Sequence, residues 1–127
     1  MSVIVLDAGA LVAVDRDDRP MITRLLAARA RGDTLRTNAM VVAQVWRGTG
    51  GRQANLASAL HGVDVRPVDE GAGRSAGQLL GRSGTSDAID ATVVLLARPG
   101  DRILTSDPDD LQRLADAAGL PVRVIRC

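Results

Sequence analysis

Four aspartates stand where a small α/β protein could use them as metal ligands. Asp7 follows the apolar run VIVL, Asp107 follows RILTS, and Asp87 and Asp90 lie three residues apart in SDAIDATVVLLA. Parallel sheets bind ligands beyond the carboxyl ends of their strands, so Asp7 and Asp107 could lie together there. Residues three apart lie on the same face of a helix, so the side chains of Asp87 and Asp90 would point in the same direction. We therefore expect these carboxylates to converge in one crevice.

Such a group of carboxylates would suit a hard divalent cation. Like charges in a partly buried crevice repel one another and lose hydration, and a bound cation offsets both costs. Oxygen ligands favour Mg²⁺ or Mn²⁺ over zinc, and one histidine with one cysteine cannot form a Cys/His cluster. The chemistry expected of this site is activation of water for attack on a phosphodiester.

Helix capping is the alternative interpretation for three of these acids. Asp7, Asp87 and Asp107 each precede a predicted helix, where a carboxylate accepts backbone N–H groups and favours the helix dipole. Asp90 differs, because we expect it inside an apolar helix, past the first turn or near the end, where a carboxylate has no capping role. Spacing alone leaves capping and metal binding both open.

Strands and helices alternate along the whole chain. We predict strands at 3–6, 35–37, 63–65, 102–105 and 122–125, and helices at 8–14, 21–30, 39–47, 52–60, 70–80 with Asp69 as its cap, 88–97 and 108–118. The sequence GTGG at 48–51 is predicted to be a turn, and Met21, Leu25, Leu26 and Ala28 are expected to face the core. This alternation indicates a parallel sheet with helices on both faces.

Composition limits the classes of protein to which this chain could belong. Its 127 residues suit one domain over 1–127, and a net charge of +1 lacks the excess of a strongly basic nucleic-acid-binding domain. All 16 basic residues are Arg, so there is no Lys for a P-loop or a Schiff base. A lone Cys127 forms no internal disulfide, and the N-terminal apolar run is short. We expect a cytoplasmic protein without a membrane span.

Three segments together resemble PIN-domain ribonucleases, and most closely the VapC-type toxins of bacterial toxin–antitoxin systems. They are VIVLDAGALVAV, SDAIDATVVLLA and RILTSDPDDL, and in order and spacing they extend the resemblance over nearly the whole chain. The resemblance implies a three-layer α/β/α domain with a central parallel sheet of four to five strands. It also implies an endoribonuclease that cleaves tRNA or rRNA with Mg²⁺ or Mn²⁺ through metal-activated water. The partners implied are a second copy of the chain and a VapB-like antitoxin, which in such toxins binds an apolar groove between helices near 21–26.

The resemblance also assigns the site residue by residue. The family's first, third and fourth acids fall on Asp7, Asp90 and Asp107, with Thr105 or Ser106 as a polar helper. Asp87 matches an extra acid of some relatives and joins these three as an expected metal ligand.

One position departs from the family pattern. The family's second acid is a Glu on the helix after the second strand, and Gln44 of VVAQVWRG takes that place in the catalytic set. An amide is a neutral ligand that removes one negative charge and cannot act as a general base. The number of metals and the activity itself therefore stay open, and Asp87 is one candidate to supply the lost charge.

Two further classes of function compete with the nuclease. A PIN-like protein with a decayed site could still bind RNA or an antitoxin without cleaving. A haloacid-dehalogenase-type phosphatase would need an acid at Gly9, and a response-regulator receiver would need a late Lys, so neither pattern fits.

Overall fold

The computed structural model describes residues 2–48 and 51–127, where five strands alternate with seven helices. The strands are β1 (Val3–Leu6), β2 (Thr34–Asn38), β3 (Asp64–Arg66), β4 (Arg102–Thr105) and β5 (Arg123–Arg126). The helices are α1 (Ala8–Asp15), α2 (Arg19–Ala30), α3 (Ala39–Val45), α4 (Ala54–Leu60), α5 (Glu70–Ser83), α6 (Ala88–Val94) and α7 (Pro108–Ala117). All five predicted strands are confirmed, and none of their ends differs from the prediction by more than one residue. In this part of the chain, no helix is long and apolar enough to cross a membrane.

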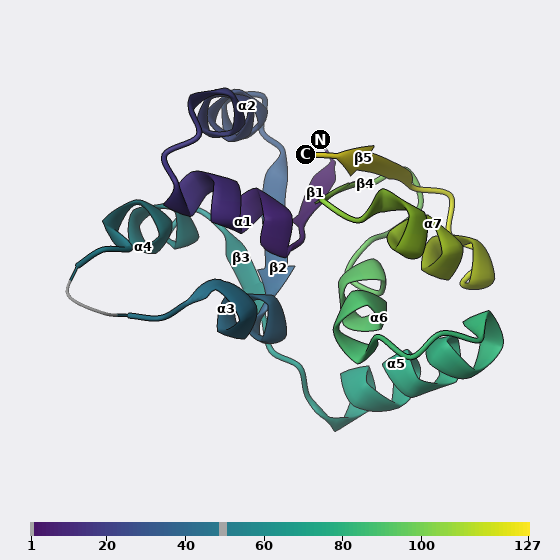
Figure 1. Cartoon of the computed structure of the whole chain (residues 1–127). Helices are drawn as coiled ribbons and strands as arrows, with labels where there is room; N and C mark the ends of the chain where they lie inside the picture. Colours follow the sequence, from purple (N-terminus) through teal and green to yellow (C-terminus); the bar gives the residue numbers. More distant parts are fainter. Residues whose placement is uncertain (1, 49–50) are drawn as a thin grey trace.

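The five strands form one sheet in the order β3-β2-β1-β4-β5, and each neighbouring pair is parallel. Parallel strands are joined by right-handed crossovers, so the direction in which the sheet grows decides which face each helix covers. The chain moves outward from β1 to β3 with α1 to α4 on one face, then returns through β4 to β5 with α5 to α7 on the other (Figure 1). The predicted three-layer α/β/α architecture with a central parallel sheet is confirmed.

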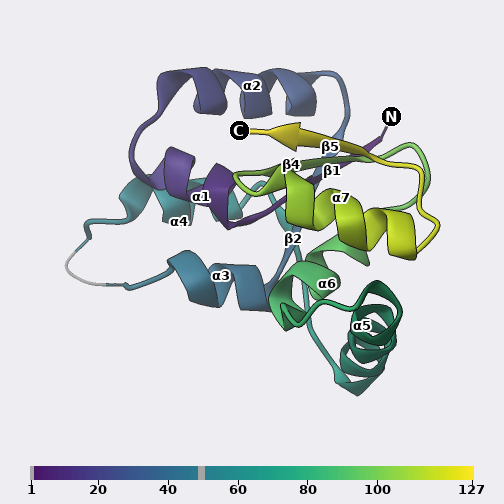
Figure 2. The same ribbon diagram turned by 45° about the vertical axis from the view of Figure 1, so that its right-hand side comes forward.

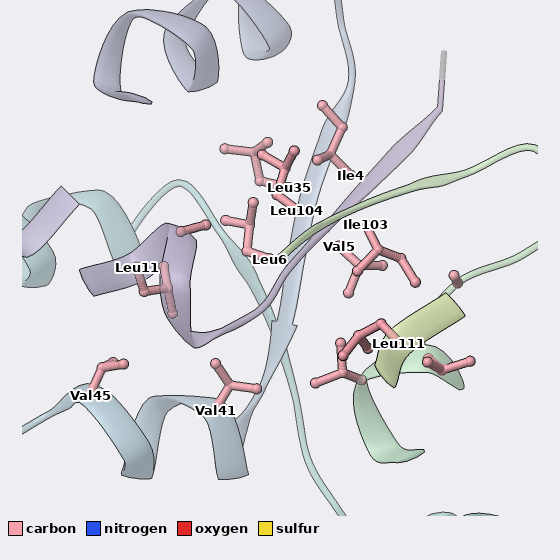
Figure 3. Close-up of a cluster of buried hydrophobic side chains, with 14 of the residues drawn as sticks. Ile4, Val5, Leu6, Leu11, Leu35, Val41, Val45, Ile103, Leu104 and Leu111 are labelled. Carbon is pink, nitrogen blue, oxygen red and sulfur yellow. The ribbon is translucent and has the colours of Figure 1, made fainter. Parts of the chain in front are cut away.

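The central strands are apolar because helices cover both of their faces. Side chains alternate along a strand, so Leu6 points toward Leu11 of α1 while Val5 points toward the side of Leu111 of α7 (Figure 3). Leu6, Leu11 and Leu111 are fully buried, as is Val5. This two-sided core fixes the carboxyl ends of β1 and β4, where the candidate site lies.

Three predictions for helices α2 and α6 were wrong: one helix start, one core residue and one helix end. Helix α2 begins at Arg19, because Asp18 caps it by accepting from the backbone N–H of Met21. Leu26 of that helix is 59% exposed, because Met21, Leu25 and Ala28 already fill its inward stripe. Helix α6 ends at Val94, well before the predicted residue 97. Its start at Ala88 agrees with the prediction, and this start places Asp90 in the first turn rather than past it.

The predicted GTGG turn can be followed only at its ends. Gly48 and Gly51 both have positive φ angles, of 69° and 71°, which a glycine adopts without strain. Thr49 and Gly50 lie outside the described residues.

Candidate metal centre

Asp7 lies where the strand order reverses, between β1 and β4. The chain leaves β1 toward β2 on one side, and β4 lies on the other, so the carboxyl ends of β1 and β4 border a topological switch point. The backbone N–H of Asp7 donates to the carbonyl of Leu104 at 3.0 Å, which holds the residue against the end of β4. Asp7 therefore lies at the carboxyl edge of the sheet beside β4, where the sequence predicts a ligand-binding crevice.

Both carboxylate oxygens of the buried Asp7 accept a hydrogen bond. Oδ1 accepts from the backbone N–H of Ala8 at 2.8 Å, which is the predicted cap of α1. Oδ2 accepts from the hydroxyl of Thr105 at 2.7 Å. The same hydroxyl accepts from the backbone N–H of Asp107 at 3.0 Å, so Thr105 rather than Ser106 links the two predicted ligands.

Asp90 is 9% exposed and lies on the first turn of α6. Across residues 2–48 and 51–127, no hydrogen bond reaches its carboxylate, although its backbone N–H donates to Oδ1 of Asp87. Burial raises the pKa of Asp90 to about 7, and the charges of Asp87, Asp7, Asp107 and Asp110 add to this shift. A nearly buried carboxylate without a donor beside four other acids is the group that a cation would stabilise most.

Asp107 and Asp110 complete a group of three carboxylates with Asp90. One oxygen of each residue lies within 4.8 Å of an oxygen of the other two. The carboxyl of Asp110 lies close enough to Asp107 to share a proton, which raises the pKa of Asp107, and partial desolvation adds to that shift. Although Asp107 precedes α7, its side chain makes no capping bond. The capping interpretation therefore does not account for this residue.

Asp110 is the functional candidate that the sequence analysis missed. The sequence DPDD already contained the signal, because residues 107 and 110 are three apart and lie together at the start of a helix. Only Asp107 of that segment was expected to bind metal, because the approach of Asp110 to Asp90 depends on how α7 packs against α6.

The other two predicted site residues, Asp87 and Gln44, are not part of this group of three carboxylates. Asp87 caps α6, as the alternative interpretation held, and its charge still raises the pKa of Asp90. Gln44 has an exposed side chain near the end of α3, and within the described ranges no hydrogen bond links it to another residue. The structure thus brings Asp90 and Asp107 together, places Asp7 beside them, and leaves Gln44 without a contact that would assign it a role.

Gly9 allows the start of α1, which follows Asp7, to lie close to the loop after β4, which contains Asp107. A Cβ on Gly9 would lie 2.9 Å from Cβ of Ser106 and 3.0 Å from its backbone nitrogen. Real side chains do not tolerate such contacts with backbone, so only glycine lets the first turn of α1 approach the loop after β4 this closely. Gly9, two residues after Asp7, therefore helps to determine the geometry of the site.

The donor set fits a hard divalent cation. Three carboxylates, with Asp7 beside them, offer only oxygen ligands, and oxygen ligands suit Mg²⁺ or Mn²⁺. The nearly buried Asp90 carboxylate that lacks a hydrogen-bond donor is the observation that favours an ion here over a purely structural acid cluster.

Comparisons with known proteins support the fold by structure alone. No family model matches the chain, and no curated protein matches it by sequence. Among solved structures, the chain is similar to one from the crystal structure of VapBC2 from Rickettsia felis bound to a DNA fragment from their promoter. The two share 14% sequence identity with a TM-score of 0.71, over 97% of this chain and 98% of the other. At this low identity the likeness shows that the chain has the PIN-like fold of its VapBC2 neighbour.

Proposed function

We propose that this protein is a Mg²⁺-dependent endoribonuclease of the VapC type, with Mn²⁺ as an alternative ion. The observation that carries the proposal is the group formed by Asp90, Asp107 and Asp110 at the switch point between β1 and β4. When bound, a divalent ion supplies a Lewis acid that lowers the pKa of water and offsets charge on a phosphate group. The resemblance of the three sequence segments to VapC-type toxins favours RNA as the source of that phosphate.

The residues that would hold the ion are Asp90, Asp107 and Asp110, with Asp7 beside them. Asp110 adds a carboxylate to a site in which Gln44 supplies none, so it compensates for the lost charge better than Asp87, whose Oδ1 caps α6. Thr105 positions this set, because its hydroxyl bonds to Asp7 and to the backbone of Asp107. Because Asp90, Asp107 and Asp110 form a single group of carboxylates, we infer that the site holds one principal ion rather than two.

Cleavage of total tRNA and of rRNA by the purified protein tests this proposal. We expect cleavage that requires Mg²⁺, stops with a chelator and is absent in the Asp90→Asn variant. Asp109→Asn is the matched control, because Asp109 shares the first turn of α7 but lies outside the three-carboxylate group. Equal cleavage by wild type and Asp90→Asn would contradict the assigned site and point to a contaminating nuclease.

A non-catalytic RNA- or antitoxin-binding protein is the alternative, and the exposed Gln44 is the observation that favours it. In that case wild type would bind RNA without cleaving it, and Gln44→Glu would cleave. No activity in either protein, together with tight binding of RNA, would also favour this alternative.

An antitoxin partner is part of the proposed function. An apolar cleft of about 70 Å³ between α1, α2 and α4 is lined by Leu11, Ile22, Leu25 and Leu26 among others. The solved neighbour is a VapBC2 complex, and a VapB-like antitoxin would cover this cleft. We expect a small protein encoded beside this chain to copurify with it, and Leu26→Arg to weaken that association. Val65→Arg, at an exposed position of the edge strand β3, is the control.

Homodimer formation and a cytoplasmic location complete the proposal. Trp46 is 40% exposed at the end of α3. Aromatic residues are enriched in protein interfaces, so this side chain is a candidate for burial between two copies of the chain. Light scattering of the purified chain measures the dimer, and Trp46→Ala is expected to weaken it.

A further inference from the structure

A polar cleft of about 260 Å³ opens directly beside Asp90. One wall is the loop between α5 and α6 with the start of α6, and the other is formed by residues of α7. Figure 2 shows α6 between α5 and α7. Its polar lining consists of Thr85, Ser86, Asp87, Asp90, Asp110 and Arg113. The cleft therefore has carboxylates of the candidate metal centre, two hydroxyls and one guanidinium.

Arg113 is the unusual member of this lining. It is exposed on α7, and Asp109, Asp110 and Asp116 stand four residues before, three before and three after it. Acids at these spacings commonly pair with an arginine on the same helix. Within the described residues Arg113 nevertheless makes no ion pair, whereas Arg74 of α5 pairs with Glu70 at 2.9 Å.

The neighbouring acids are engaged elsewhere. Asp110 approaches Asp107 and Asp90, Asp116 accepts from Gln112 at 2.9 Å, and Asp87 caps α6. Arg113 therefore lines the cleft that contains the candidate metal ligands without an ion-pair partner among the described residues. A planar guanidinium beside a cation site is suited to grip an oxyanion whose other oxygens face the cation.

We propose that this cleft seats a phosphate of the RNA strand and that Arg113 is the positioning residue for it. The inference rests on the proposed nuclease function and names the group that binds substrate beside the metal centre. Without a cation the carboxylates repel a phosphate, so the cleft attracts RNA only when the ion and Arg113 act together. Arg113 holds the strand and takes no part in bond breaking, so its loss affects binding more than turnover.

The test compares wild type with Arg113→Gln and Arg113→Lys. A short fluorescent single-stranded RNA of mixed sequence is titrated in Mg²⁺ at several salt concentrations, and cleavage of the same RNA gives kcat and KM. We expect Arg113→Gln to raise Kd and KM roughly tenfold and to reduce the salt slope of binding by about 1, with kcat nearly unchanged. Arg113→Lys should recover the salt slope, because it keeps the charge, but only part of the affinity.

Two controls separate this role from a structural one. Arg24→Ala removes an exposed arginine from α2 in the opposite helix layer and should leave Kd and the salt slope unchanged. The affinity of Arg113→Gln for Mn²⁺, measured without RNA, should equal that of wild type. Unchanged Kd and salt slope in Arg113→Gln would overturn this inference while the nuclease function stands. A wild type that neither binds nor cleaves RNA would overturn both.

Discussion

The hydroxyl of Thr105 donates a 2.7 Å hydrogen bond to Oδ2 of Asp7, although 98 positions separate the two residues. The bond joins the ends of β1 and β4, and the same hydroxyl accepts from the backbone N–H of Asp107. One buried side chain therefore sets the orientation of one predicted ligand and the backbone of another.

We expect Thr105→Val to lower the free energy of unfolding by about 2 kcal/mol, because it leaves a buried carboxylate oxygen and a backbone N–H without a partner. The affinity for Mn²⁺ should fall as well, since Asp7 loses its orientation. Thr37→Val is the matched control: Thr37 is equally buried but donates to the carbonyl of Leu6 at 2.8 Å. Denaturant unfolding and Mn²⁺ titration measure both variants, and equal Mn²⁺ affinities would contradict the role of Thr105.

Asp110→Asn should weaken binding of Mn²⁺ about tenfold or more, because it removes one of three converging charges. Asp109→Asn makes the same change one residue away and should leave the affinity unchanged. Isothermal titration of the metal-free protein gives both values. Equal affinities in the two variants would remove Asp110 from the ligand set and return Asp87 as the candidate for the missing charge.

The pH dependence of stability should follow Asp90, whose pKa rises from 3.8 to about 7 on folding. Between these values the folded state binds more protons than the unfolded state, so the metal-free protein loses stability as pH rises from about 4 to about 7. Asp90→Asn should abolish this loss and stabilise the metal-free protein at pH 8 by on the order of 2 kcal/mol.

Thermal unfolding at pH 5 and pH 8, with and without Mg²⁺, measures this effect. Mg²⁺ should stabilise wild type more at pH 8 than at pH 5, because protonated Asp90 is a poor ligand. A wild-type protein that is equally stable at both pH values would show that Asp90 is not desolvated in solution.

Gly9→Ala should destabilise the protein by about 2 kcal/mol, since the added Cβ would lie 2.9 Å from Ser106 and force α1 away from the β4–α7 loop. Gly73→Ala in α5 is the control: a Cβ there meets nothing within 4 Å, and alanine favours the helix. We expect Gly73→Ala to be neutral or stabilising. A Gly9→Ala variant as stable as wild type would mean that the two segments separate at little cost.

The sequence by itself determined the strands, the parallel α/β architecture and the positions of Asp7 and Asp107, because each follows from local patterns. Apolar runs of four residues specify buried strands such as Val3–Leu6, and an acid just after such a strand must lie at the carboxyl edge of the sheet. The capping interpretation of Asp87 also followed from local sequence alone, because the residue directly precedes a predicted helix.

Only the tertiary structure decided which carboxylates meet. The strand order places β4 beside β1, and the packing of α6 on α7 brings Asp110 to Asp90 across 20 positions of sequence. The choice of Thr105 over Ser106 and the contact of Gly9 with Ser106 likewise depend on sheet register and helix packing. Local propensity contains no information about such distances, because they arise when separate elements bury their apolar faces against one another.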